Sequence, residues 1–267
     1  MLRKRTPLFA WALLGAVVSA ASCRHAAEEP VRRGRVRVAA AEDLSGAFGD
    51  LIVRFGQSHD VDVAVSFGSS GTFYKQLLDD APFDMFFSAD VAYPNQLASR
   101  GLTVPQSEFT YAVGRLVLWT TSSSAVDIER QGLQSLTAAT IAHVAIADPD
   151  DGPYGRAAVA AMQAAGIYDA VRPKLVIGGT VAQAMQLVES GAADAGFVSL
   201  TLALATSSRD NGRRFDIPVD MYPRLEQGGA ILRRAADLDA ARALRGFVLS
   251  ADGQAILKQH GLFPPDR

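Results

Sequence analysis

Residues 61–78 constrain the fold most, because the sequence changes there from a strand pattern to a helix pattern at one short turn. Before the turn, apolar residues alternate along the chain at Val61, Val63, Val65 and Phe67. The turn is Gly68-Ser69-Ser70-Gly71, and a helical pattern follows over residues 73–78. Such a junction gathers backbone N–H groups and hydroxyls at the positive end of a helix dipole, as anion sites do. A serine-capped helix after an ordinary turn would give the same short motif.

Three further junctions of the same kind lie along the chain. The strand pattern of residues 35–41 precedes a helix that opens at Glu42-Asp43-Leu44-Ser45. The other two lie in the second half of the chain, where strand patterns are followed by residues 148–155 and 178–180. Neighbouring strand ends that both open helices form a crevice, which is where α/β sheets bind ligands. Two junctions in each half of the chain therefore predict a ligand held between two lobes.

The N-terminus has the pattern of an export signal. Arg3-Lys4-Arg5 forms a basic start, and residues 7–21 are apolar but too few to span a bilayer securely. Small residues then precede Cys23. We therefore expect a signal peptide over residues 1–22, and hence an extracytoplasmic protein.

Cys23 is the single cysteine of the chain and directly follows the small residues. This position is typical of a lipobox, in which the cysteine becomes the acylated first residue of a bacterial lipoprotein. Residues 23–34 would then be a lipid-anchored tether. Because Ala20 stands where leucine is commoner, plain cleavage to a soluble periplasmic protein is the alternative. One cysteine also excludes an intramolecular disulfide.

The net charge limits the possible partners. The chain of 267 residues carries a formal net charge of −2, and loss of three positive residues with the signal peptide leaves about −5. An acidic body argues against nucleic acid or an anionic membrane surface as a partner. It does not argue against an anion ligand, because neutral N–H and O–H dipoles hold a buried oxyanion without a salt bridge.

Further motifs follow one another through the chain. In order they are Ala39-Ala40-Ala41-Glu42-Asp43-Leu44, Ser66-Phe67-Gly68-Ser69-Ser70-Gly71-Thr72, residues 81–90, Gly114-Arg115-Leu116-Val117-Leu118-Trp119, Ala147-Asp148-Pro149, Pro153-Tyr154-Gly155, Gly196-Phe197-Val198-Ser199 and residues 247–254. Together, over residues 35–263, they resemble the periplasmic molybdate-binding proteins of ABC importers. The resemblance implies an α/β type II periplasmic binding protein with two lobes, each a mixed sheet flanked by helices, and the ligand in the interlobe cleft. Residues 35–118 with 218–267 would form lobe 1, and residues 119–217 lobe 2.

The resemblance also implies a set of binding residues. In this family, hydroxyls and main-chain N–H groups at the four junctions, and at one later strand end, hold the oxyanion. The matching positions here are Glu42, Asp43, Ser69, Ser70, Tyr154, Val181 through its backbone N–H, and Ser199. No protein atom would bond directly to the metal centre of the oxyanion, and no cofactor is implied. Tyr154 would equally suit packing along the cleft.

The acidic pair Glu42-Asp43 departs from the family, which commonly has a serine or another neutral polar residue here. A carboxylate aimed at a dianion is repelled in a low-dielectric cleft. In one interpretation Asp43 caps the helix that starts at Leu44, and Glu42 turns outward. In a second, a carboxylate accepts a hydrogen bond from a protonated ligand oxygen, which suits phosphate, arsenate or a phosphonate. In a third, Glu42, Asp43 and Tyr154 ligate a cation such as ferric iron.

The sequence does not indicate an enzyme. Its four histidines lie away from the junctions, and Gly68-Ser69-Ser70-Gly71 lacks the spacing of a nucleophile elbow. The expected function is that of a monomeric extracytoplasmic binding protein, which captures molybdate or tungstate and delivers it to the membrane subunits of an ABC permease. A binding protein for another oxyanion and a lipid-tethered sensor without a permease are the alternatives.

Overall fold

The computed structural model describes residues 34–205 and 210–265. The predicted signal peptide, Cys23 and the tether up to residue 33 lie outside these residues, so the lipobox stays a prediction. No helix in the described ranges is long and apolar enough to cross a membrane.

Lobe 1 is built, within the described residues, on a sheet of five strands in the order β2-β1-β3-β10-β4. The strands are β1 (Gly34–Ala41), β2 (Val61–Gly68), β3 (Met85–Ser88), β4 (Phe109–Val113) and β10 (Glu226–Ile231). Strand β1 pairs in parallel with β2 and β3, whereas β10 runs antiparallel between β3 and β4. The carboxyl ends of β1, β2 and β3 therefore meet at one edge of the sheet, where the next helices begin.

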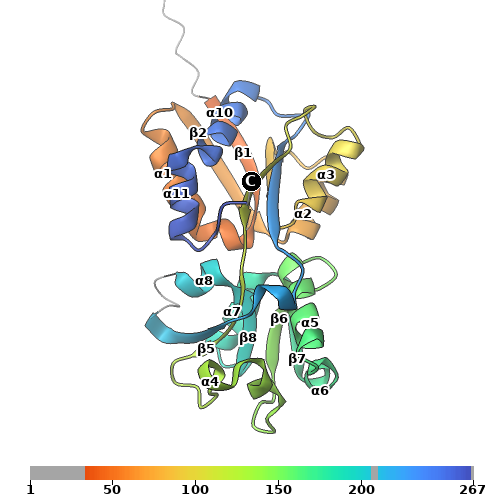
Figure 1. The fold of residues 1–267 in the computed structure, drawn as a ribbon. Coiled ribbons are helices and arrows are strands. Elements are labelled where there is room, and N and C mark those ends of the chain that lie inside the picture. The colour runs from red at the N-terminus through yellow and green to blue at the C-terminus, as the bar shows by residue number, and fades with distance from the viewer. Residues whose placement is uncertain (1–33, 206–209, 266–267) are drawn as a thin grey trace, which may run out of the picture. The chain divides into compact units, whose positions relative to one another are not determined.

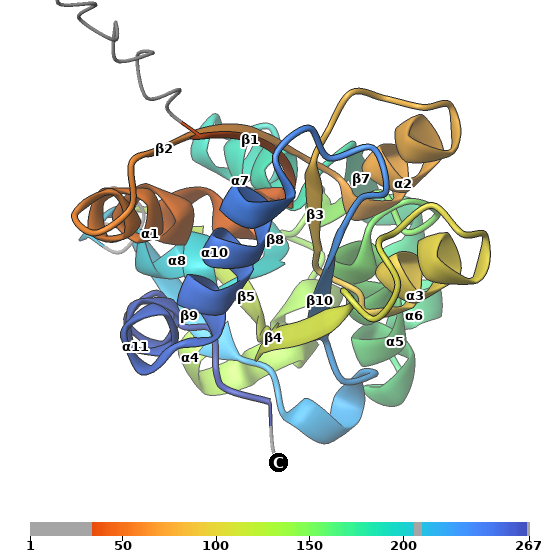
Figure 2. The same ribbon diagram turned by 90° about the horizontal axis from the view of Figure 1, so that it is seen from above.

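Helices cover both faces of this sheet. Helices α1, α10 and α11 lie on one side, and α2 and α3 on the other (Figure 1 and Figure 2). Their bounds are α1 (Ser45–Gly56), which follows the 3-10 turn η1 (Glu42–Leu44), α2 (Ser70–Leu78), α3 (Ala92–Ser99), α10 (Leu238–Leu249) and α11 (Ala251–Gln259). Helix α1 buries Phe48, Leu51 and Phe55, which share one face at helical spacing as the sequence predicts.

Lobe 2 has a second sheet, which in the described ranges has the strand order β7-β6-β8-β5-β9. The strands are β5 (Leu116–Thr121), β6 (Val144–Ala147), β7 (Leu175–Gly178), β8 (Ala195–Ser199) and β9 (Gly212–Asp216). Its helices are α4 (Ile128–Gln131), α5 (Pro153–Ala164), α6 (Tyr168–Val171), α7 (Val181–Glu189) and α8 (Leu200–Leu204), with 3-10 turns η2 (Gly132–Thr137), η3 (Arg172–Lys174) and η4 (Val219–Met221). Two mixed sheets flanked by helices confirm the predicted fold.

The chain crosses between the lobes twice. The first crossing lies at Gly114 and Arg115, because β5 already pairs with β8 from Leu116 onward. The predicted boundary at residue 118 therefore falls inside a strand of the second sheet. The return crossing runs through residues 217–225, where the carbonyl of Leu225 accepts a hydrogen bond of 2.9 Å from the N–H of Gly114. The two crossing segments are thus tied to each other.

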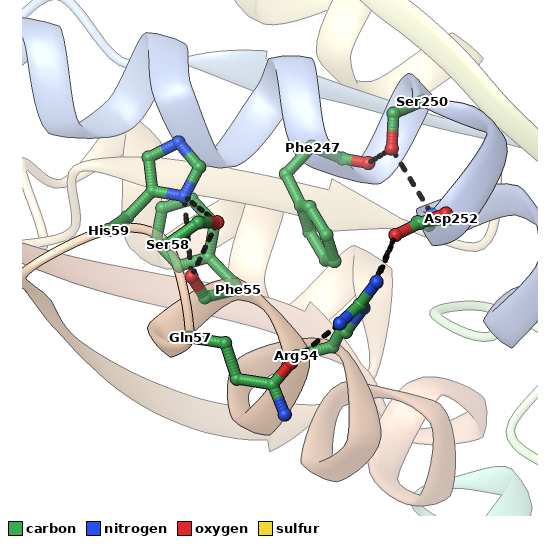
Figure 3. A network of polar contacts seen from close by, with 9 residues as sticks. Arg54, Phe55, Gln57, Ser58, His59, Phe247, Ser250 and Asp252 are labelled. Atoms are coloured by element: carbon green, nitrogen blue, oxygen red, sulfur yellow. Dashed lines mark hydrogen bonds and ion pairs between the residues drawn. The ribbon is translucent and has the colours of Figure 1, made fainter.

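The C-terminal helices complete lobe 1 by packing on α1. Figure 3 shows the polar contacts where α1 packs against the C-terminal helices. Arg54 of α1 forms an ion pair of 2.7 Å with Asp252 of α11. The ring of Phe55 lies between those of His59 and Phe247, with centroid distances of 4.3 and 5.5 Å. The first and last parts of the described chain are therefore packed against each other in lobe 1.

A buried strand and one ion pair stabilise the centre of lobe 1. Met85, Phe86 and Phe87 of β3 are fully buried. Asp84, just before β3, receives two bonds of 3.0 Å from the Arg37 guanidinium of β1. Although burial of the Asp84 carboxyl opposes its ionisation, the hydrogen bonds from Arg37 keep its pKa below the usual value. Asp84 is therefore a structural residue at the start of β3.

Candidate functional site

Residues from all four predicted junctions line one small cavity between the lobes. Its volume is about 20 Å³, far below the roughly 300–1,000 Å³ of pockets for drug-sized molecules. The lining residues are Ala41, Glu42, Asp43, Gly68, Ser69, Ser70, Ala89, Ala147, Gly152, Pro153, Tyr154, Thr180 and Val181. This size favours a small ion over a sugar, a peptide or a nucleotide.

The N-terminus of α2 brings two serines with different roles. Ser70 is buried, and its Oγ accepts a hydrogen bond of 2.9 Å from the N–H of Ala89. Its own hydroxyl proton has no acceptor among the described residues, so Ser70 is equipped to donate into the cavity. Ser69 instead donates its hydroxyl to the carbonyl of Asp151 in lobe 2, at 2.9 Å.

The N-termini of α5 and α7 face the cavity from lobe 2. Helix α7 begins at Val181 after the N-cap Thr180, whose side chain accepts a hydrogen bond of 3.1 Å from the N–H of Gln183. Helix α5 begins at Pro153, which has no N–H to satisfy. The remaining first-turn N–H groups of both helices have no partner within their own helix. They add the positive ends of two dipoles to the site, where anions are stabilised.

Asp43 lies at the floor of the cavity and links the two lobes. Its Oδ2 accepts a hydrogen bond of 2.8 Å from the hydroxyl of Tyr154 and another from the side-chain amide of Gln227. The Oε1 of Gln227 in turn accepts a hydrogen bond of 2.9 Å from the hydroxyl of Tyr111. Asp43 makes no capping bond to a helix. The interpretation of Asp43 as a helix cap is therefore wrong, because its carboxylate turns inward to these donors.

The ionisation of this group is set mainly by burial. Loss of water raises the pKa of Asp43 to about 6; the hydrogen bonds from Gln227 and Tyr154 oppose the shift, and the charge of Glu42 adds to it. Burial also raises the pKa of Tyr154 and of Tyr111 well above the usual value, so both phenols stay neutral donors. Glu42 is half-buried, and burial raises its pKa as well.

The residues described at this cavity offer a bound anion no basic side chain. No lysine or arginine is found among the described residues that line the cavity. Within the described ranges, no group of three or more His, Cys, Asp or Glu side chains is arranged to hold a metal ion. The interpretation of Glu42, Asp43 and Tyr154 as a ferric-iron site stays a prediction.

Contacts at the cavity rim hold the two lobes together. The carbonyl of Asp151 accepts hydrogen bonds from the Ser69 hydroxyl and from the N–H of Gly71, the latter at 3.0 Å. The side chain of Asp151 pairs with Lys75 of α2 at 2.6 Å. A second ion pair between the lobes, outside the cavity lining, joins Arg156 of α5 to Asp90 of lobe 1 at 2.6 Å.

Ser199 differs from the other predicted binding residues because it is not in the cavity lining. It is fully buried at the end of β8, where its hydroxyl bonds to the Thr201 hydroxyl at 2.8 Å. Its Oγ also accepts a hydrogen bond from the N–H of Leu202 and so caps α8. The role predicted for Ser199 in binding stays a prediction.

Sequence reasoning missed the residues that support the cavity from a distance. Gln227 of β10 and Tyr111 of β4 are buried and connect Asp43 to the centre of lobe 1. No local motif marks either residue, because they reach Asp43 only through the pairing of β10 with β3 and β4. Asp151 lies inside a predicted junction, but its contacts across the rim depend on the approach of the lobes.

Comparisons with known proteins agree with this architecture. A family model described as bacterial extracellular solute-binding protein matches residues 36–263. The chain is 34% identical over 232 residues to the molybdate-binding protein ModA of Rhodobacter capsulatus, which covers 87% of this chain and 89% of that one. The solved periplasmic molybdate-binding protein of Azotobacter vinelandii superposes with a TM-score of 0.79 at 30% identity, covering 86% of this chain and 100% of that one. The putative ABC transporter substrate-binding lipoprotein YvgL of Bacillus subtilis is 25% identical over 195 residues, 71% of this chain and 72% of that one.

Proposed function

The chain belongs to the bacterial extracellular solute-binding proteins and, within them, to the molybdate-binding protein family; on that premise we propose that it captures a molybdate or tungstate dianion in the interlobe cavity. The protein then delivers the anion to an ABC permease. Membership of a family of solute-binding proteins also confirms the prediction that this protein is not an enzyme.

One observation carries the proposal: helix N-termini from both lobes converge on a cavity that is lined by no lysine or arginine of the described ranges. The donors are the Ser70 hydroxyl and the N–H groups at the starts of α5 and α7. The N-terminus of α2 also lies at the cavity, although its Gly71 N–H is bonded to Asp151. A fully deprotonated tetrahedral oxyanion offers acceptors in every direction, so a shell of neutral donors matches it. The free energy of binding then comes from convergent dipoles at a site shielded from water.

The contacts across the rim support capture by closure of the two lobes. Ser69, Gly71 and Lys75 of lobe 1 all contact Asp151 of lobe 2. A ligand that contacts both lobes favours the arrangement in which these bonds form. A permease would recognise the protein in this closed arrangement of the lobes.

We further propose that the protein works on the outer face of the membrane as a lipid-anchored monomer. The support is the basic and apolar N-terminus that precedes Cys23. The family is extracellular, and one relative is named as a lipoprotein. Cys23 would carry the lipid and residues 23–34 would act as the tether.

Isothermal titration calorimetry of the mature protein with molybdate, tungstate, sulfate and phosphate at neutral pH tests the proposal. We expect heat and saturable binding with molybdate and tungstate, and none with sulfate or phosphate. Absence of a binding heat with molybdate and tungstate, together with binding of phosphate, would contradict the proposal. That outcome would mean that Glu42 and Asp43 select a ligand that brings its own proton.

A further inference from the structure

The two carboxylate oxygens of Asp43 have unlike surroundings. Oδ2 receives two hydrogen bonds, from Tyr154 and Gln227. Oδ1 is buried and, among the described residues, has no hydrogen-bond partner. Asp43 itself is 1% exposed and lines the cavity. Because Oδ2 is occupied, Oδ1 is the oxygen left for a group bound in the cavity.

This asymmetry is that of a neutral carboxylic acid. The carbonyl oxygen of such an acid accepts hydrogen bonds, while its hydroxyl oxygen carries a proton to donate. A carboxylate would leave a buried charged oxygen without a donor, which is costly. It would also repel a dianion in the same cavity.

We propose that Asp43 binds the oxyanion as a neutral acid and donates a hydrogen bond from Oδ1, so that capture of a dianion at neutral or alkaline pH takes up one proton from solvent. The proton adds to Oδ1 of the carboxylate, and no other bond forms or breaks. This inference rests on the proposed function, since it assumes a ligand that carries no proton of its own.

Burial and the charge of Glu42 favour this protonation, and the hydrogen bonds to Asp43 oppose it. The titratable groups that face it are Glu42 from the same turn, Tyr154 from α5 and Tyr111 from β4. Glu42 disfavours a second negative charge, whereas the hydrogen bonds that Tyr154 and Gln227 donate to Oδ2 favour the ionised form, and burial outweighs them. In the described part of the chain, no basic side chain is among the groups that act on the ionisation of Asp43.

A defined pH dependence follows. With a pKa of about 6, roughly one molecule in ten has a neutral Asp43 at pH 7, and roughly one in a hundred at pH 8. When the competent form is a fraction of the total, the apparent Kd rises in inverse proportion to that fraction. The apparent Kd for molybdate should therefore rise about tenfold per pH unit above pH 6.

Calorimetric titration of the mature protein with micromolar molybdate tests the inference between pH 6 and 9. At pH 8, two buffers with different enthalpies of ionisation should report uptake of about one proton per anion. Asp43→Asn places an uncharged amide donor at the same position. This variant should bind molybdate with a Kd independent of pH, and about a hundredfold tighter than the unmodified protein at pH 8.

Two further variants separate Asp43 from other carboxylates. Asp252→Asn removes an exposed charge of lobe 1 and should keep the original pH slope. Glu42→Gln should keep the slope as well; a slope lost in this variant but retained in Asp43→Asn would overturn the assignment to Asp43.

The experiment distinguishes failure of this inference from failure of the proposed function. A molybdate Kd that stays flat from pH 6 to 9, with no buffer-dependent heat in the unmodified protein, overturns the inference and leaves molybdate binding intact. Absence of molybdate binding at every pH, in the unmodified protein and in Asp43→Asn alike, overturns the proposed function and the inference with it. Because proton uptake is measured on the unmodified protein, misfolding of a variant does not prevent the test.

Discussion

The hydroxyl of Tyr154 in lobe 2 donates a hydrogen bond of 2.8 Å to Oδ2 of Asp43 in lobe 1. This bond joins the two lobes directly beneath the cavity, and both side chains are almost fully buried. A phenol has one proton, so in this arrangement Tyr154 holds Asp43 and does not donate to a ligand. The Ser70 hydroxyl then donates to the anion, together with Oδ1 of the neutral Asp43 and the backbone N–H groups around the cavity.

Replacement of Ser70 by alanine tests that assignment. The change removes the hydroxyl whose proton has no acceptor among the described residues. It should weaken molybdate binding by about 1–3 kcal/mol, because the anion loses a donor in a buried site. Calorimetry measures the change in Kd. Affinity equal to that of the unmodified protein would remove Ser70 from the binding site.

Replacement of Gly71 by alanine tests closure of the lobes. A Cβ at this position would lie 2.4 Å from the carbonyl oxygen of Asp151 and would force the rim apart. Overpacking of this kind costs about 1–3 kcal/mol, and here the cost should appear as weaker molybdate binding. Gly246→Ala is the matched control, because a Cβ there meets nothing within 4 Å. Equal molybdate affinities of the two variants would contradict closure at Gly71.

The pH dependence of stability without ligand tests the burial of Asp43. Its pKa is about 6 when folded and about 4 when unfolded, so the folded state binds more protons between these values. Stability should therefore fall as pH rises from about 4 to 6, by about 3 kcal/mol, and stay lower above pH 6.

Asp43→Asn removes this titration. In urea unfolding at pH 4.5, 6 and 8, the free energy of unfolding of the variant relative to that of the unmodified protein should increase from pH 4.5 to 6 and change little from pH 6 to 8. Asp252→Asn, which alters an exposed carboxylate of the same lobe, should show no such trend. Parallel curves for Asp43→Asn and the unmodified protein would mean that Asp43 is ionised in the fold without cost.

The fold could be predicted in outline because its signals are local. Alternating residues marked β2, small residues marked the turn at Ser69 and Ser70, and helical spacing marked α1. The expected lobe boundary at residue 118 came from the resemblance, and no local signal in the sequence marks the crossing at Gly114 and Arg115. Only the pairing of Leu116 with Ser199 shows where β5 joins the second sheet.

The site could be predicted less completely, for a physical reason. Residues at strand ends can be recognised from the sequence pattern. The structure brings six of the seven predicted binding residues to the cavity lining. The direction of a side chain is decided by its partners, and the partners of Asp43 come from β10 and α5, far away in sequence. The inward turn of Asp43 was therefore not readable from its own neighbours.

The lipid anchor has a separate test. Replacement of Cys23 by serine removes the thiol that would carry the lipid, and the variant should leave the membrane fraction of cells that express it. Immunoblots of membrane and soluble fractions measure the distribution. A Cys23→Ser protein that still sediments with membranes would show that the lipobox prediction is wrong.

Crystals of the mature protein grown with tungstate test the central claim most directly, because anomalous scattering locates tungsten independently of the protein model. We predict one strong anomalous peak in the cavity between the lobes, with tungstate oxygens in hydrogen-bonding range of the Ser70 hydroxyl and the Val181 N–H. A peak elsewhere, or an empty cavity at saturating tungstate, would contradict the claim that this cavity is the oxyanion site.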